Sequence, residues 1–288
     1  MFLAHLARRL PLGICLGLTA CLAACSLQMP SESDVFGSGG AKSAGPTASA
    51  ASAGAPAEGL GGSSEFDPGA GLIAHFTFDE PDGRTAANAK DSSKNAKCVG
   101  TCTRPPGRLG LAFGIRNTVS PSDWIELPAG IFAGHSAITL SVWLRDLSTT
   151  RSEAPLFHFS SGAREAIYFT PDDRNFQASD GGAHLGGLHA GASFVQLWSG
   201  RPSLTDQAWH QVAVSWNSAN IKLYIDGERV DSDQSPSVVP SELGTTSPNY
   251  LGRGPDEGNP ALSAEIDDLR VYDRVLSAPQ IALLYQLR

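Results

Sequence analysis

Alternation of apolar and polar residues is the strongest pattern in the chain, and it is clearest between Trp209 and Val230. Two runs in this stretch place an apolar side chain at every second position, with polar residues at most positions between them. A period of two is typical of strands that bury one face. The pair Asp226–Gly227 favours a tight turn with positive φ angles. The stretch therefore predicts three antiparallel strands, at 209–216, 221–225 and 228–230.

Short apolar runs recur along the rest of the chain, separated by Gly, Pro, Asp and Asn. Turn signals about every 8–12 residues are typical of a β-sandwich. In one run the pattern points Ile138 and Leu144 inward and Trp143 outward, whereas the polar stretch 82–97 reads as turns. Further strands are predicted at 72–78, 111–113, 124–127, 138–145, 154–160, 165–170, 174–178, 192–199, 250–253 and 264–272.

One helix is predicted at the end of the chain. Ser277 and Gln280 have the spacing of a capping box, and Ile281, Leu284 and Tyr285 follow on one side. The expected fold class is therefore all-β, a two-sheet antiparallel jelly-roll sandwich with one short C-terminal helix.

Residues 1–24 are expected to be a signal peptide. Arg8 and Arg9 precede an apolar core, 10–22, which is too short for a stable membrane span. The sequence before Cys25, Leu-Ala-Ala, resembles the lipobox of bacterial lipoproteins. That resemblance implies transfer of diacylglycerol to the Cys25 sulfur, cleavage before this residue and acylation of its new amino group. The alternative is an ordinary secretory signal that is cut near Ala24.

The resemblance to lipoproteins implies a location and a partner. Membrane lipid would hold the protein in the cell envelope through Cys25, and Ser26 in place of an Asp favours the outer membrane. Which side of that membrane the protein faces stays open. Residues 25–68 are rich in Gly, Ala, Ser and Pro, have little to bury and predict a disordered tether. The globular domain is expected at 69–288.

The charge of the chain bears on its partners, and its cysteine content predicts a disulfide. The net charge of −8 argues against nucleic-acid binding, which requires a basic surface. Of the 5 cysteines, Cys15 and Cys21 leave with the signal and Cys25 is assigned to lipid. The remaining pair, Cys98 and Cys102, predicts a disulfide, because an even pair in an exported domain is usually oxidised.

Several segments occur in the order found in concanavalin A-like lectin/glucanase domains. They are HFTFDE, KDSSKNA, LAFG, ITLSVWLR, WHQVAVSW, KLYIDGERV, YLGR and EIDDLRVYDRVLSAPQI, and together they span essentially all of 69–288. They most resemble the laminin-G-like jelly-roll branch found in bacterial surface proteins. The resemblance implies two packed sheets, one of them concave. It implies no single activity, because lectins, adhesion modules, hydrolases and structural spacers share this fold.

The segment Glu265-Ile-Asp267 is similar to the start of the catalytic strand of retaining glycanases, E-x-D-x-E or E-x-D-x-x-E. The two positions for the second Glu hold Leu269 and Arg270. Without that acid/base residue the leaving group cannot be protonated. The seven His residues also lack the i, i+4 spacing of a zinc site. The sequence therefore predicts a protein that is not an enzyme.

Related domains often hold a structural calcium ion, which implies a possible Ca²⁺ site here. Its ligands would be Asp91 and Asp267, with Asp268 able to join. Asp267 and Leu269 are two positions apart, so in a regular strand their side chains point to the same face. This predicts that the Asp267 carboxylate points into the interior. In the alternative reading Asp267 pairs with an arginine or caps backbone amides, and Asp91 forms an Asx turn. Lys94, which stands where the family motif has Gly, weakens the calcium reading.

Sugar-binding relatives use the concave sheet or the loops at its rim, where aromatic rings stack on sugars. The candidates for such contacts are Trp143, Tyr168 and Trp198, with His158 and His184 as hydrogen-bonding groups. The alternative is that these rings only pack the fold. The first functional hypothesis is a non-catalytic recognition module that binds carbohydrate or an envelope or extracellular protein. The second is a structural or adhesive lipoprotein, and a degenerate glycoside hydrolase is a distant third.

Overall fold

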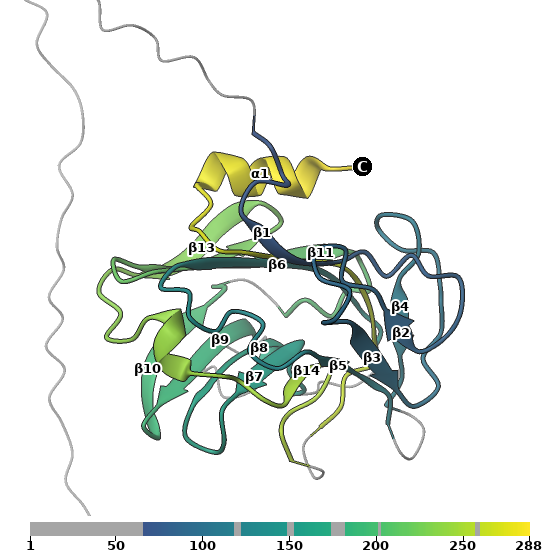
Figure 1. Cartoon of the computed structure of the whole chain (residues 1–288), viewed down its shortest axis with the longest axis horizontal. Helices are drawn as coiled ribbons and strands as arrows, with labels where there is room; N and C mark the ends of the chain where they lie inside the picture. Colours follow the sequence, from purple (N-terminus) through teal and green to yellow (C-terminus); the bar gives the residue numbers. More distant parts are fainter. Residues whose placement is uncertain (1–65, 118–121, 149–152, 174–181, 201–202, 257–259) are drawn as a thin grey trace, which may run out of the picture. The chain divides into compact units, whose positions relative to one another are not determined.

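A computed structural model of the chain shows two antiparallel β-sheets packed face to face, with a helix outside one of them (Figure 1). This confirms the predicted fold class. The signal peptide, Cys25, nearly all of the tether and the strand predicted at 174–178 lie outside the described residues. The structure describes residues 66–117, 122–148, 153–173, 182–200, 203–256 and 260–288.

Sheet A has the strand order β1-β15-β6-β11-β12-β13, and β4 also pairs with β15. The hairpins predicted around Trp216 are present, and Asp226 and Gly227 turn between β12 and β13 with φ angles of 54° and 79°. The strands of sheet A are β1 (Leu72–Phe76), β4 (Phe113–Ile115), β6 (Ile138–Asp146), β11 (His210–Trp216), β12 (Ile221–Ile225), β13 (Glu228–Asp233) and β15 (Ala264–Tyr272).

Sheet B has the order β10-β9-β8-β7-β14-β5-β3-β2. Strand β2 and the start of β3 lie in the stretch 82–97, which was expected to form turns, and β9 was not expected. A short 3-10 helix, η1 (Pro240–Leu243), precedes β14. The strands of sheet B are β2 (Thr85–Ala86), β3 (Ala96–Val99), β5 (Trp124–Leu127), β7 (Phe157–Ser160), β8 (Ala166–Asp173), β9 (Gly182–His189), β10 (Ala192–Trp198) and β14 (Asn249–Leu251).

The main hydrophobic core lies between the two sheets. The alternate residues of β6 from Ile138 to Leu144 point into it, as predicted. Full burial of each large apolar side chain contributes about 1.5–3 kcal/mol, and fully or almost fully buried aromatic residues are the largest side chains of this core. Those residues are Phe76, Phe78, Phe113, Phe132, Phe157, Phe159, Phe169 and Trp216.

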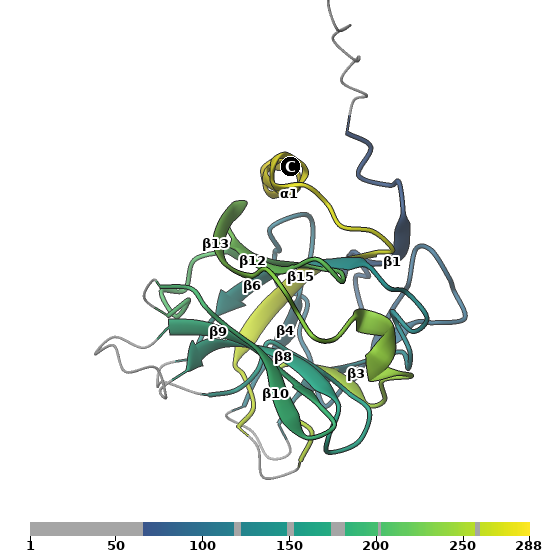
Figure 2. The ribbon, with the colours of Figure 1, turned by 90° about the vertical axis from the view of Figure 1, so that its left-hand side faces the viewer.

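The C-terminal helix α1 (Ala278–Gln286) covers part of the outer face of sheet A (Figure 2). Its predicted capping box is present, because the Ser277 hydroxyl accepts from the amide of Gln280 and the Gln280 side chain accepts from the amide of Ser277. The helix buries Ile281 and Leu284 against a second cluster that includes Tyr224 of β12. In the part of the chain that the structure describes, no helix has the length and apolarity to cross a membrane.

The described chain enters the domain on the same side as α1 (Figures 1 and 2). Phe66 packs against the cluster beneath the helix. The Tyr272 hydroxyl donates to the carbonyl of Pro68 at 2.9 Å, and Arg274 Nε donates to the carbonyl of Ala70 at 3.1 Å. The first described residues are therefore fixed to sheet A and not to sheet B.

Candidate functional site

The outer face of sheet B carries a row of aromatic and histidine side chains. Phe157, Phe159 and Phe169 fill the core, so alternation turns the residues between them, including His158 and Tyr168, to the outer face. His158 lies directly opposite Tyr168 in the ladder between β7 and β8. We call this set the aromatic row; across the strands from β14 to β10 its members are Tyr250, His158, Tyr168, His184 and Trp198.

Tyr168 lies across the neighbouring strand β9 because Gly186 leaves room for it. The two residues are paired in the ladder, and a Cβ atom on Gly186 would lie 2.4 Å from both Cζ and Oη of Tyr168. Any larger residue at 186 would push the phenol ring away. The glycine therefore determines how the ring is presented.

The rings of the row contact one another. His158 and Tyr168 are nearly parallel, with centroids 5.9 Å apart and an interplanar angle of 15°. His184 stacks on Trp198 with a centroid distance of 3.9 Å and meets Tyr168 edge-on at 5.9 Å. These contacts, together with the ladder, restrict the movement of the rings and preorganise the face.

Both histidines of the row favour the neutral form. Burial lowers the pKa of His158 to about 4, because desolvation disfavours the imidazolium. Burial also lowers the pKa of His184, against the opposing effect of Asp173, whose carboxylate oxygen is 2.9 Å from Nδ1. His184 is also 3% exposed, and its Nε2 lies 2.5 Å from Gln196 Oε1, so both of its nitrogens already face protein groups. His158 is therefore the histidine of the row suited to bond a hydroxylated ligand, because a neutral imidazole offers one donor and one acceptor.

A cation covers the rings at the β14 end of the row. The Arg253 guanidinium lies 4.5 Å from the ring centroid of Trp124 and 5.1 Å from that of Tyr250. Such cation–π contacts occupy one face of each ring. The part of the row offered to a ligand is therefore centred on His158 and Tyr168.

A pocket of about 200 Å³ opens beside His158 and Tyr168. Its polar groups are the two row residues, Thr170 and Glu153, and prolines form much of the rest. A small apolar pocket with a few convergent polar groups beside an aromatic ring is a binding arrangement for a small polar ligand. Its lining residues are Glu153, Pro155, His158, Tyr168, Thr170, Gly254, Pro255 and Pro260.

Trp143, a predicted ligand contact, does not lie with the others. It points away from the core as predicted, but it is only 1% exposed. The ring of Tyr285 in α1 stacks on it with centroids 5.4 Å apart, and the Arg108 guanidinium lies 4.7 Å from its centroid. The prediction for Trp143 was therefore wrong, because the helix covers the face from which a ligand would come.

The predicted orientation of Asp267 was also wrong. A bulge shifts the register between Asp267 and Arg270, and Asp268 has a φ angle of 45°. Ile266 and Leu269 consequently both point into the core, and Asp267 falls opposite Trp143 on the outer face. It is nevertheless buried, because its Oδ2 accepts from the amide of Leu109 at 2.8 Å in a loop that covers it. Burial raises the pKa of Asp267 to about 7.

The three carboxylates proposed for calcium each have other partners. Asp91 accepts from the amide and hydroxyl of Ser93, which is the alternative Asx turn. Asp268 pairs with Arg270 Nε at 2.8 Å and His75 Nε2 at 2.7 Å. No group of three or more His, Cys, Asp or Glu side chains suited to a metal occurs among the described residues. This arrangement does not fit a calcium site built from Asp91, Asp267 and Asp268.

The glycanase-like segment lies on the outer face of sheet A. Glu265 is buried and forms ion pairs with Arg145 and, at 3.8 Å, with Arg116. It pairs in the ladder with Arg145 of β6 and Gly114 of β4. Two guanidinium groups thus hold its carboxylate, and Leu269 points into the core.

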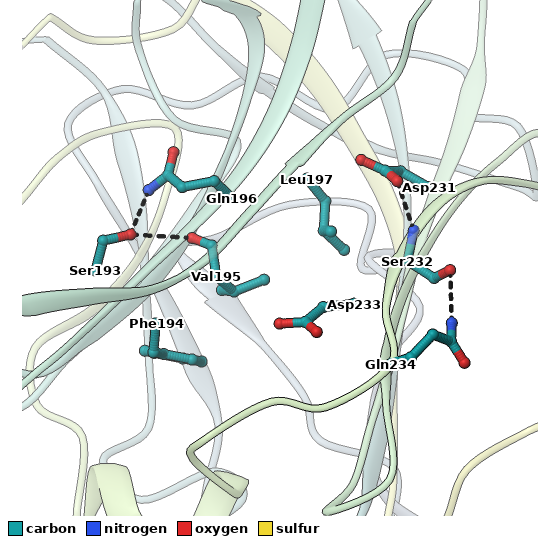
Figure 3. Close-up of a pocket in the computed structure, with 9 residues that line it drawn as sticks. All are labelled: Ser193, Phe194, Val195, Gln196, Leu197, Asp231, Ser232, Asp233 and Gln234. Atoms are coloured by element: carbon teal, nitrogen blue, oxygen red, sulfur yellow. Dashed lines mark hydrogen bonds between the residues drawn. The ribbon is translucent and has the colours of Figure 1, made fainter.

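A second hollow, of about 450 Å³, separates the edge strands β10 and β13 (Figure 3). At one end the two sheets are joined, because Asp231 Oδ2 accepts from the amide of Trp198 at 2.9 Å. Phe194 on its floor stacks on Trp216 of the core. Its polar residues bond mainly to one another, as Ser193 does with Gln196 and Ser232 with Gln234. None of its contacts points to a particular ligand.

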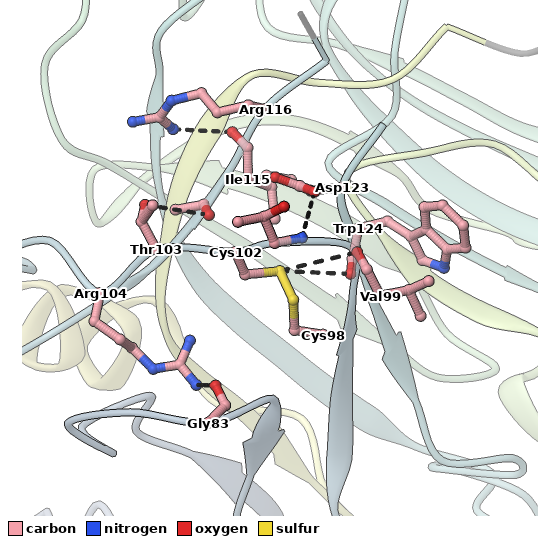
Figure 4. The surroundings of a disulfide bond; sticks show 12 residues. Gly83, Cys98, Val99, Cys102, Thr103, Arg104, Ile115, Arg116, Asp123 and Trp124 are labelled. Carbon is pink, nitrogen blue, oxygen red and sulfur yellow. Dashed lines mark hydrogen bonds between the residues drawn. A yellow bond between two sulfur atoms is a disulfide. The ribbon is translucent and has the colours of Figure 1, made fainter. Parts of the chain in front are cut away.

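The predicted disulfide is present. Cys98 of β3 is bonded to Cys102 with a Cα–Cα distance of 6.2 Å (Figure 4). The loop between them is fixed to the start of β5, because Asp123 accepts from the amide of Thr101 at 2.7 Å. The disulfide lies at the edge of sheet B and supports the end of that sheet away from Tyr168.

The fold and this face define a lectin-like β-sandwich. A family model of the concanavalin A-like lectin/glucanases superfamily matches residues 119–282, which are more than half of the chain. The chain belongs to this superfamily, as the resemblance in its sequence indicated.

A curated relative is the sushi, von Willebrand factor type A, EGF and pentraxin domain-containing protein 1 of Rattus norvegicus. It is 27% identical over 190 residues, which are 63% of this chain but only 5% of that protein.

Among solved structures, domain 4 of AbnA is similar to the chain. AbnA is a GH43 extracellular arabinanase from Geobacillus stearothermophilus, and the domain was solved in complex with arabinotriose. Its TM-score is 0.60 at 21% identity, covering 75% of this chain and 98% of that domain. The binding domain of botulinum neurotoxin serotype C1 has a TM-score of 0.56 at 13% identity, covering 75% of this chain and 51% of that one. The sialidase of Trypanosoma rangeli has a TM-score of 0.54 at 18% identity, covering 76% and 33%. At these identities the likeness establishes the fold.

Proposed function

We propose that the protein is a non-catalytic carbohydrate-binding module, and that the part of the aromatic row around Tyr168 is its binding face. The presentation of the Tyr168 ring over Gly186, beside a pocket with hydrogen-bonding groups, is the observation that carries the proposal. Aromatic faces stack on sugar rings, and the neutral His158 imidazole supplies a hydrogen bond to a hydroxyl. The arabinotriose complex of the domain from AbnA and the sialyl complex of a botulinum neurotoxin binding domain support carbohydrate as the partner class.

The absence of catalysis is part of the proposal. It is supported by Glu265, which is held between two arginines, and by Leu269 and Arg270 at the two positions where a glycanase has its second Glu. A nucleophile without an acid/base partner cannot complete glycoside hydrolysis.

A glycan-array screen followed by calorimetry tests carbohydrate binding. The probe is the exported full chain carrying Cys25→Ser, and the matched variants are Tyr168→Ala on the row and Tyr224→Phe beneath α1. We expect binding by the parent and the Tyr224→Phe variant, and a loss of at least about tenfold, ~1.4 kcal/mol, for Tyr168→Ala. Absence of binding to every glycan, or equal binding by Tyr168→Ala, overturns the proposal.

We further propose that acylated Cys25 anchors the module in the cell envelope, at the outer membrane. The lipobox-like Leu-Ala-Ala-Cys sequence and Ser26 support this location. Cells fed a clickable palmitate analogue should label the wild-type chain, and Cys25→Ser should abolish the label and release the protein from membranes. Equal labelling of both chains contradicts the anchor.

A further inference from the structure

The pocket beside Tyr168 is small and lies next to the aromatic row. Its volume of about 200 Å³ corresponds to roughly seven waters at ~30 Å³ each, and lies below the ~300–1,000 Å³ of sites for drug-sized ligands. It has room for one sugar ring and not for two.

The walls of the pocket are stiff and chemically simple. Pro155, Pro255 and Pro260 contribute fixed φ angles and no backbone N–H groups. The hydrogen-bonding side chains of the pocket are the His158 ring, the Tyr168 and Thr170 hydroxyls and the Glu153 carboxylate. Thr170 is 4% exposed and comes from β8, so it is held by the ladder on the same face as Tyr168.

The row is asymmetric around this pocket. On the β14 side Arg253 already covers one face of the Tyr250 and Trp124 rings. On the β9 side the Tyr168 ring continues to His184, which meets it edge-on. A chain that leaves the pocket can stack over Tyr168 on one side, and it meets a covered surface on the other.

We infer that the face recognises the end of a carbohydrate chain, with one terminal sugar ring held in the pocket and the next ring over Tyr168. The inference rests on the carbohydrate binding proposed above and specifies its mode. A ligand bound in this way gains contacts from its first two or three rings only. A polymer interior, which has a ring on both sides of every unit, would have to pass over the covered β14 side and should bind weakly.

The test measures affinity against chain length by calorimetry with the Cys25→Ser full chain. The probes are linear oligosaccharides of two to six units from the arabinan, xylan, glucan and N-acetylglucosamine series, and cyclic or end-capped members of the series that binds. We expect affinity to stop rising at two or three units and to fall at least tenfold for the cyclic or capped forms. Affinity that keeps rising beyond four units, with capped forms bound equally, overturns the inference. No binding in any series overturns the proposed function instead.

Thr170→Leu provides a second, independent measurement. The larger side chain fills the pocket and leaves the Tyr168 ring in place, so we expect at least a tenfold loss of affinity for the short oligosaccharides. Thr85→Val, on the exposed edge strand β2, is the matched control and should bind as the parent does. Binding by Thr170→Leu at parental affinity, with Tyr168→Ala inactive, means that the ligand lies on the row but does not enter the pocket.

Discussion

Tyr168 lies directly above Gly186, with its Cζ and Oη atoms 2.4 Å from the position of a Cβ on that glycine. A residue without a side chain on one strand thus sets the direction of an aromatic ring on the next. This relationship lays the half-buried phenol ring along a β-sheet surface that would otherwise carry an upright side chain.

Gly186→Ala should therefore weaken carbohydrate binding without unfolding the protein. The methyl group displaces only the tip of a side chain, so the melting temperature should change little, whereas affinity should fall by about tenfold, ~1.4 kcal/mol. Calorimetry and thermal unfolding measure the two effects. In the Tyr168→Ala background the glycine substitution should have no further effect, because both act on one ring. Additive losses would contradict this coupling.

Trp143→Phe should lower the stability of the protein without changing carbohydrate binding, the opposite of Gly186→Ala. The indole is buried between β6 and Tyr285 of α1, so its loss should reduce the free energy of unfolding by about 1–3 kcal/mol, measured with urea. Carbohydrate affinity should not change, because Trp143 lies on the other sheet from the pocket. A selective loss of binding at unchanged stability would restore Trp143 as a ligand contact.

Asp267→Asn should stabilise the domain at alkaline pH. The pKa of Asp267 is raised to about 7 by burial, so ionisation favours the unfolded state above the ordinary carboxyl pKa of about 4, and this effect is complete above pH 7. Asparagine keeps an acceptor for the amide of Leu109. The variant should gain on the order of 2–4 kcal/mol over wild type at pH 8 and less at pH 5, in urea unfolding. A gain in the free energy of unfolding that decreases as the pH rises would contradict this prediction.

His210 should stabilise the fold at low pH and lose this effect at high pH. Hydrogen bonds to Asp226, at 2.8 Å, and Asp206, at 3.0 Å, raise its pKa to about 9. A raised folded-state pKa gives stabilisation that is complete below about pH 6.5 and disappears as the pH passes through 9. His210→Gln should thus lose most stability at pH 6 and little at pH 10. Equal losses at both pH values would show that the contacts act without the proton.

Much of the fold follows from local patterns. The strands around Trp216 were predictable because apolar residues alternate without interruption there, and α1 was predictable because Ser277 and Gln280 form its cap. Strand β9 was missed because Gly186 and Gly187 remove the side chains that would show its alternation. The same glycines are the ones that create room for Tyr168 and, on the inner face, for Phe194.

The site was only partly predictable from the sequence, because several of its features depend on tertiary structure. Alternation correctly turned Trp143 outward, but no local pattern tells which face a helix more than a hundred residues later will cover. It also assigned Asp267 to the interior, since a continuous strand was assumed and the bulge at Asp268 reverses the parity. Thr170 could have been found from the period of two that continues beyond Tyr168, whereas the contribution of Pro255 depends on a loop distant in sequence.

The contacts of Phe66 and Pro68 fix the N-terminal end of the described chain to sheet A, the sheet that carries α1. That end of the described chain therefore lies on the opposite face of the sandwich from Tyr168, so a ligand that reaches the Tyr168 surface of sheet B does not meet it.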